Sequence, residues 1–226
     1  CSPETGQPDM GRLVRMLYEM LARTVLAAEF PRARVDIPTR MVASHPEAVY
    51  RGLALSRVTK AVTVGIARAG TMPSQIVFEL MNEVLDPALV RQDHLFMSRQ
   101  TNEAGEVIGA TWHDAKIGRD VDDRVVLFPD PMGATGSSMI SAIRYYRTAL
   151  EGKPSKCIAM HLIVTPEYIR NVLAEHPDVV IYALRIDRGL STPAALRSEP
   201  GSLGAEEKGL NSHQYIVPGA GGVGEI

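Results

Sequence analysis

The sequence predicts an α/β protein with a central, mostly parallel sheet flanked by helices and carrying a β-hairpin flap. Three apolar runs rich in Val and Ile each lead through a loop into a segment with helical periodicity, at residues 61–66, 125–128 and 157–164. These runs lack polar–apolar alternation, which is typical of strands buried on both faces of a parallel sheet. A glycine-rich loop directly follows the second run.

The first 58 residues are expected to form a helical arm. After a polar, proline-containing start, apolar residues recur at three and four positions from Met10 onward, and Pro31 marks the latest end of this helix. Its stripe is rich in Met, which is typical of a core or of a subunit interface. Ser44 can cap a second helix that continues to Leu55.

Three strand–loop–helix units and one further strand then make up the core. In each unit the apolar strand is followed by turn residues and by a helical pattern. The strands are residues 61–66, 125–128, 157–164 and 179–186, and the helices begin near Pro73, Ser137 and Thr165. With 226 residues the chain is long enough for one α/β core and short for two, so residues 1–226 are expected to form a single domain.

Two segments interrupt this alternation. Residues 92–118 contain two apolar runs around Asn102-Glu103-Ala104-Gly105, and this is a hairpin signal that predicts the flap. Residues 187–213 are rich in Gly, Pro, Ser and charge and have little periodicity, so we expect an excursion loop within a C-terminal tail of residues 187–226.

Composition excludes several classes of function. The formal net charge of -2 argues against a nucleic-acid partner, because sequence-independent binding needs a basic face. No apolar run reaches the ~18–20 residues that span a bilayer, so we expect a cytoplasmic protein without a membrane partner. The two cysteines make no disulfide framework, and the six scattered histidines have no metal-ligand spacing. The buried setting expected of His161 suggests a core histidine.

The loop after the second strand, residues 130–138, has the composition of a phosphate site. Ligands of open parallel sheets bind beyond the carboxyl ends of the strands, which is where this loop lies. Its glycines allow close backbone approach, its hydroxyl groups can donate, and the helix that begins there adds the positive end of its dipole. These groups come from Gly133, Thr135, Gly136, Ser137 and Ser138. Asp130, in front of them, can accept two hydrogen bonds from a vicinal ribose diol.

The order of residues in this loop excludes two common motifs and resembles a third. No Lys follows the glycines, as a P-loop requires, and the acid precedes the glycines, unlike in a dinucleotide fingerprint. The run Asp-Pro-Met-Gly-Ala-Thr-Gly-Ser-Ser resembles the phosphoribosyl diphosphate loop of uracil phosphoribosyltransferases, which has Asp-Pro-Met-Leu-Ala-Thr-Gly-Gly-Ser. Most other phosphoribosyltransferases have a second acid where this chain has Pro131, so the start favours the uracil branch of the type I family.

Three further segments agree with this resemblance in order along the chain. Residues 66–70 are similar to the family's Ile-Leu-Arg-Ala-Gly turn, whose arginine is here Arg68. Residues 95–99 resemble the start of the family's flexible flap, whose arginine is here Arg99. Residues 215–219 resemble the family's uracil-recognition segment.

The resemblance implies transfer of a 5-phosphoribosyl group from phosphoribosyl diphosphate to uracil, giving UMP and diphosphate. It implies catalytic roles for Arg68 and Asp130, Mg²⁺ carried by the diphosphate with no metal ligand from the protein, and a homodimer or higher homo-oligomer. The residues it assigns to phosphoribosyl diphosphate are Arg68, Arg99, Asp130, Pro131, Met132, Gly133, Ala134, Thr135, Gly136, Ser137, Ser138 and Gly222, and those it assigns to uracil are Met132, Tyr215, Ile216, Gly221, Gly222 and Val223.

Two departures from the family pattern leave alternatives open. Gly222 stands where the family has an aspartate beside the base and the sugar diphosphate, and Gly133 replaces the leucine of the phosphate loop. Loss of the aspartate favours one alternative, a catalytically weakened paralogue that acts as a nucleotide-sensing or regulatory module. Another alternative is a phosphoribosyltransferase for a different base.

Overall fold

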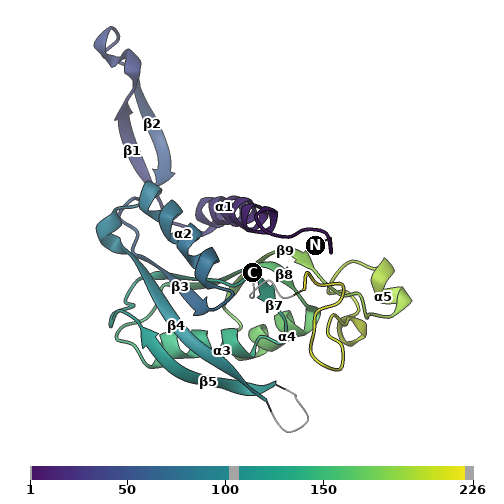
Figure 1. The fold of residues 1–226 in the computed structure, drawn as a ribbon. Coiled ribbons are helices and arrows are strands. Elements are labelled where there is room, and N and C mark those ends of the chain that lie inside the picture. Colours follow the sequence, from purple (N-terminus) through teal and green to yellow (C-terminus); the bar gives the residue numbers. More distant parts are fainter. Residues whose placement is uncertain (1, 102–106, 222–226) are drawn as a thin grey trace.

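A mostly parallel sheet forms the centre of the chain, as the sequence predicts (Figure 1). The computed structural model describes residues 2–101 and 107–221, and it describes side chains for all of these except residues 97–115. Within these residues seven strands join in the order β5-β4-β3-β6-β8-β7, and β9 also pairs with β8. The strands are β3 (Ala61–Ala67), β4 (Val90–Thr101), β5 (Val107–Lys116), β6 (Val125–Pro129), β7 (Met132–Gly133), β8 (Lys156–Val164) and β9 (Val180–Ile186).

The only antiparallel pair described in this sheet is the predicted hairpin flap. Strands β4 and β5 pair from His94 opposite Lys116 to Thr101 opposite Val107. The predicted turn, residues 102–106, lies outside the described residues. All other strand pairs of the sheet are parallel, so their carboxyl ends lie on one edge.

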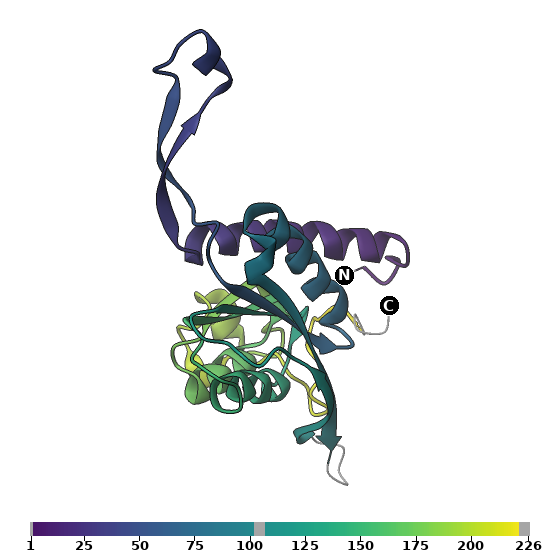
Figure 2. The same cartoon turned by 90° about the vertical axis from the view of Figure 1, so that its left-hand side faces the viewer.

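Alternate residues of the central strands enter two separate cores. On β6, Leu127 packs into one core and Phe128 into the other, and both are fully buried. The first core lies under the helices α1 (Asp9–Glu29) and α2 (Thr71–Val84), and the second lies under α3 (Ser137–Thr148) and α4 (Pro166–Glu175) (Figures 1 and 2). Because both faces are covered, these strands are apolar at most positions on both faces.

The N-terminal arm differs from the prediction of a helical segment over residues 1–58. Beyond α1, strands β1 (Arg32–Pro38) and β2 (Val49–Leu55) form an antiparallel ribbon that projects from the body (Figure 2). Ser44 caps no second helix. Its N–H donates to the Met41 carbonyl oxygen and closes a short 3-10 turn at the tip (Arg40–Ala43). The sequence pattern predicted a helix here because the periodicity of a single segment does not show that β2 pairs with β1.

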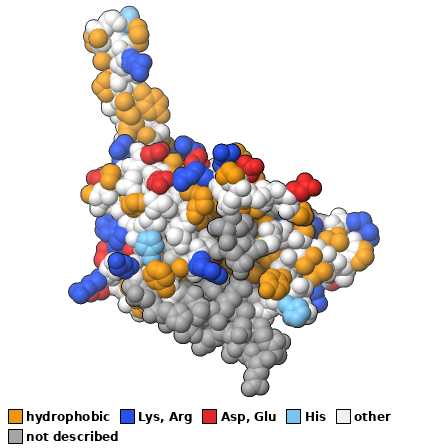
Figure 3. All heavy atoms as spheres, in the orientation of Figure 1, with side chains coloured by type: hydrophobic (Ala, Val, Ile, Leu, Met, Phe, Trp, Pro, Cys, Tyr) orange, Lys and Arg blue, Asp and Glu red, His pale blue; other side chains and the backbone are white. Residues whose placement is uncertain are grey.

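Helix α1 buries only part of the predicted methionine-rich stripe, namely Leu21 and Val25. Its buried positions are Val14, Tyr18, Leu21, Ala22, Val25 and Leu26. Leu13, Met16 and Met20 are exposed. The exposed side chains of Ile37, Tyr50 and Leu53 add apolar surface along the arm, which Figure 3 shows on one face. Among the described helices, none has the length and apolar content of a membrane span.

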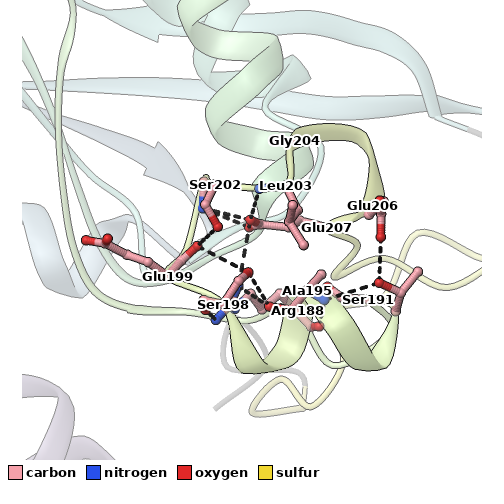
Figure 4. A network of polar contacts seen from close by, with 12 residues as sticks. Arg188, Ser191, Ala195, Ser198, Glu199, Ser202, Leu203, Gly204, Glu206 and Glu207 are labelled. Carbon is pink, nitrogen blue, oxygen red and sulfur yellow. Dashed lines mark hydrogen bonds and ion pairs between the residues drawn. The ribbon is translucent and has the colours of Figure 1, made fainter.

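The excursion loop is held together by a buried carboxylate (Figure 4). Both oxygens of Glu207 accept the Gly201 N–H, at 2.8 and 3.0 Å, and these bonds hold the pKa of Glu207 below its usual range. Arg188 lies 3.7 Å from the same carboxylate and donates to the Ala195 carbonyl oxygen, in the short helix α5 (Pro193–Arg197). A second short turn, η3, covers Gly204–Glu206. Hydrogen bonds between side chains and backbone order this loop. Such bonds do not require a periodic pattern of apolar residues, so the sequence shows no period here.

Candidate active site

The parallel strands end at a common edge, and a polar residue follows each of four of them. Arg68 follows β3, Asp130 follows β6, Thr165 follows β8 and Asp187 follows β9. Open α/β sheets bind their ligands beyond this edge. The structure therefore brings Arg68 and Asp130, which the sequence places far apart, to the same edge of the sheet.

The backbone of the phosphate loop, residues 130–138, is anchored through its carbonyl oxygens. The Gly133 carbonyl accepts the Thr165 N–H at 3.0 Å, and the Ala134 carbonyl accepts the Thr165 hydroxyl at 2.6 Å. The Thr135 carbonyl accepts the side-chain amide of Asn171 at 2.9 Å. In a trans peptide unit the N–H points opposite to the C=O. The N–H groups that follow these carbonyls therefore point away from Thr165 and Asn171, and N–H groups of such a glycine-containing loop can bind an anion.

The loop ends in the first turn of α3, which supplies further donors. Gly136 has φ of 86°, a left-handed conformation that favours glycine, and an added Cβ there would lie 2.9 Å from Val172 Cγ2. The hydroxyl groups of Thr135 and Ser137 lie 3.2 Å apart. The first N–H groups of a helix have no partner within it, and the helix dipole adds positive potential. Both features suit a phosphate group.

His161 is buried, as the sequence suggests, and its ring bonds to the backbone of Asp130. Its Nδ1 lies 2.5 Å from the Asp130 carbonyl oxygen and its Nε2 lies 2.6 Å from the Tyr168 hydroxyl. A carbonyl oxygen only accepts, so Nδ1 carries the proton and Nε2 accepts from Tyr168. Burial lowers the pKa of His161 to about 4, so the ring is neutral at pH 7. The side chain of Asp130 accepts the Met132 N–H at 3.2 Å.

The turn at residues 66–70 packs directly against the start of the phosphate loop. The Gly70 N–H donates to the Ile66 carbonyl oxygen at 2.9 Å. A Cβ added to Gly70 would lie 2.9 Å from the Pro129 carbonyl oxygen, so the two backbones approach as closely as glycine permits. Arg68 at this turn is exposed. The turn that carries Arg68 thus lies beside the start of the candidate phosphate loop.

The tail segment, residues 209–219, closes the same edge from the side of β9. Buried Asp187 accepts the Gly219 N–H at 2.7 Å. The Val217 N–H donates to the Gly209 carbonyl oxygen at 2.8 Å, and Leu210 forms a bridge with Ile216. The segment is a compact turn fixed to the sheet.

A family model describes this combination of fold and loop. The model of uracil phosphoribosyltransferase matches residues 2–206 of the chain. The chain belongs to the uracil phosphoribosyltransferase family. The match includes the turn with Arg68, the flap and the whole phosphate loop.

Individual relatives agree with this assignment. The chain is 36% identical over 121 residues to the uracil phosphoribosyltransferase of Acinetobacter baylyi, covering 53% of this chain and 46% of that protein. It is 32% identical over 166 residues to that of Legionella pneumophila, covering 74% of this chain and 62% of that protein. The match to the Dictyoglomus turgidum enzyme has 32% identity and covers 93% of this chain and 79% of that protein. The matches to the first two relatives thus span less than two thirds of the length of each, 46% and 62%.

A solved structure shows the same fold. The AQ2163 protein from Aquifex aeolicus superposes with a TM-score of 0.69 at 21% sequence identity, covering 98% of this chain and 86% of that one. The sheet, its flanking helices and the flap agree with the type I phosphoribosyltransferase architecture that the sequence predicts.

The residues predicted from the uracil phosphoribosyltransferase pattern fall into three groups. Arg68 and residues 130–138 lie together at the sheet edge. Tyr215, Ile216 and Gly221 lie in or just after the tail segment, and the Tyr215 side chain is 70% exposed. Gly222, Val223 and the side chain of Arg99 lie outside the described residues.

Sequence reasoning missed the residues that hold the site together. These are Glu167, Asn171 and Asp187, together with the bonds of Thr165 to the loop, since we expected Thr165 only at the start of a helix. Asp187 could have been found, because it ends an apolar strand at the ligand-binding edge. Glu167 and Asn171 carry no such signal, since a polar residue on the first turns of a helix is usual.

Proposed function

We propose that this protein transfers a 5-phosphoribosyl group from phosphoribosyl diphosphate to N1 of uracil, giving UMP and diphosphate. The candidate phosphate loop carries the proposal: an acid stands before backbone N–H groups that point away from Thr165 and Asn171, in a chain of the uracil phosphoribosyltransferase family. The acid suits the ribose diol and the N–H groups suit the 5′-phosphate.

The work of the protein in this reaction is mainly electrostatic. The bond between C1 of ribose and the diphosphate oxygen breaks, and C1 becomes oxocarbenium-like. The bond from C1 to N1 of uracil then forms, and the N1 proton leaves to the diphosphate or to water. Arg68 and Arg99 would take the charge of the leaving diphosphate, and Asp130 would hold the ribose diol. Thr135 to Ser138 would hold the 5′-phosphate. Met132, Ile216 and the main chain at Gly221 to Val223 would place the base in line with C1.

Magnesium enters this proposal with the substrate. Among the described residues there is no group of three or more His, Cys, Asp or Glu side chains that could hold a metal ion. The oxygen atoms of a diphosphate are the hard ligands that Mg²⁺ prefers, and this cation commonly binds through substrate phosphates. When bound, Mg²⁺ would neutralise part of the leaving-group charge.

The direct test is UMP formation. The protein is incubated with phosphoribosyl diphosphate, Mg²⁺ and each of a panel of bases that includes uracil, cytosine, hypoxanthine and adenine. We expect turnover with uracil and loss of turnover in Asp130→Asn. Turnover with a different base alone would reassign the substrate, and turnover with none would overturn the proposal.

The aspartate missing at position 222 favours a second candidate, a nucleotide-sensing module. Gly222→Asp distinguishes the two. In a weakened enzyme the carboxylate adds charge that acts mainly in the transition state, so kcat rises while UMP affinity changes little. In a sensing module, calorimetry shows UMP binding, and neither the natural chain nor the variant turns over.

A further inference from the structure

The first turns of α4 contact both halves of the candidate site. Thr165 bonds to two carbonyl groups of the phosphate loop, those of Gly133 and Ala134, and Asn171 bonds to a third, that of Thr135. On the same helix, both oxygens of Glu167 accept the Gly209 N–H of the tail segment at 3.0 Å. We call Thr165, Glu167 and Asn171 the brace.

Glu167 makes the contact of the brace with the tail segment. Besides the Gly209 N–H, its Oε1 accepts the Leu210 N–H at 3.3 Å. A carboxylate that accepts backbone N–H groups forms charge-assisted bonds, about twice as strong as neutral ones. Its place in the first turn of α4 adds favourable interaction with the helix dipole.

From Glu167 a short path leads to the residues that the family uses for the base. Gly209, held by Glu167, accepts the Val217 N–H through its carbonyl, and Leu210 pairs with Ile216. The Glu167 carboxylate is therefore connected to Val217 by two hydrogen bonds through Gly209, and to Ile216 through Leu210. No described bond of Glu167 goes to the phosphate loop itself, so its removal should act on one half of the site.

We propose that Glu167 is a positioning residue for base recognition, and that the brace fixes the distance between the base and the 5′-phosphate. This inference rests on the proposed function. Bringing the two substrates into line at C1 depends on that distance, and small misplacements of a bound reactant are costly in rate. Thr165 and Asn171 hold the phosphate end, and Glu167 holds the base end.

The kinetic test compares Glu167→Gln with Glu175→Gln. The first variant keeps the shape of the side chain but turns an amide NH₂ toward the N–H groups of the tail. We expect the KM for uracil to rise about tenfold or more, while the KM for phosphoribosyl diphosphate stays within about twofold. Glu175 ends the same helix in an exposed ion pair with Arg144, and its variant should change neither constant. Equal effects on both KM values, or none on either, would overturn the proposal.

Backbone hydrogen exchange tests the brace without relying on catalysis. In Glu167→Gln, peptides that cover residues 208–219 should exchange faster, and those that cover 130–138 should not. Unchanged exchange in the tail would overturn the brace even in an active enzyme. Natural protein that makes no UMP would instead overturn the proposed function. Glu167→Asp retains the charge on a shorter stem and should show a weaker form of the same KM split, which serves if the Gln variant does not fold.

Discussion

Between the phosphate loop and α4, the Tyr168 ring occupies the space that a side chain at position 133 would need. A Cβ added to Gly133 would lie 2.9 Å from Tyr168 Cδ2 and 2.9 Å from Val164 Cγ1. The leucine found here in the family pattern cannot enter while the Tyr168 ring is present. The ring is buried, and its hydroxyl holds His161, which in turn holds the Asp130 carbonyl. A departure at one residue of the loop is thus matched by a neighbour on α4.

Gly133→Leu should destabilise the protein by about 1–3 kcal/mol, because an overpacked core forces neighbouring side chains from their rotamers. Tyr168→Ala should also destabilise, since it leaves a cavity and an unpaired His161. In the double variant the leucine occupies the vacated space, so the combined loss should be smaller than the sum by about 1 kcal/mol or more. Urea unfolding of the four proteins measures these differences. Strict additivity would show that the two side chains do not share the space.

His161 should make stability depend on pH in the mildly acidic range. Burial lowers its pKa to about 4 in the folded protein, while the unfolded chain has the ordinary value of about 6.5. Below pH 6.5 the unfolded state therefore binds a proton that the folded state does not. Stability is fully present above that pH and is lost as the pH falls toward 4.

From pH 7.5 to pH 5, this linkage should lower the free energy of unfolding by about 2 kcal/mol. His161→Gln has no such group, so its free energy should fall less over the same range. The difference between the two proteins, from urea unfolding at each pH, isolates His161 from the other titrating groups. Parallel pH profiles would contradict a buried neutral histidine.

At the scale of elements, the sequence correctly predicted the helices and strands whose signal lies within one contiguous segment. The core strands and their helices were placed to within a few residues, because burial on both faces and helical period leave their mark in a contiguous stretch. The second half of the arm was misassigned, since β2 depends on a partner strand that begins at Arg32. In α1 the methionines predicted a stripe that the structure leaves exposed at Met16 and Met20.

The candidate site divides in the same way. The candidate phosphate loop is one contiguous run with a fixed order of acid, glycines and hydroxyls, so the sequence alone is sufficient to propose it. The contacts that hold the tail segment join residues far apart in the chain, such as Glu167 with Gly209 and Asp187 with Gly219. In each of these bonds a backbone N–H donates to a side-chain carboxylate. Every residue except proline has a backbone N–H, so the sequence does not show which one is the donor.

The phosphate loop and the start of α3 should bind phosphate through both hydroxyl groups. Thr135→Ala and Ser137→Ala should each weaken the binding of UMP and of phosphoribosyl diphosphate by roughly 1.5–3 kcal/mol, the range for a charge-assisted hydrogen bond. Ser198→Ala, which removes a hydroxyl group in the excursion loop, serves as the control and should bind both ligands as before. Calorimetry with each ligand measures the change. Affinities unaltered in both loop variants would remove the phosphate assignment.

At the scale of the whole molecule, the ribbon of β1 and β2, here called the arm, has no hydrophobic core of its own. A two-stranded ribbon is marginally stable in water unless something packs against it. The arm nevertheless projects from the body and exposes Ile37, Tyr50 and Leu53 (Figures 2 and 3). Helix α1 exposes Leu13, Met16 and Met20 as well. Large exposed apolar areas commonly mark interfaces between proteins.

We therefore expect a homodimer or larger homo-oligomer in which these surfaces are covered, and we expect the arm to contribute to it. Light scattering at micromolar concentration should give at least twice the mass of one chain. Leu53→Lys places a charge at a position that is 57% exposed in one chain and covered in the assembly, so its dimer should dissociate at about tenfold higher concentration. Leu196→Lys, at a position 47% exposed on α5 and away from the arm, should leave the mass unchanged. A monomeric natural protein would mean that the arm stands alone in water, and that its ladder between β1 and β2 is more stable than such ribbons usually are.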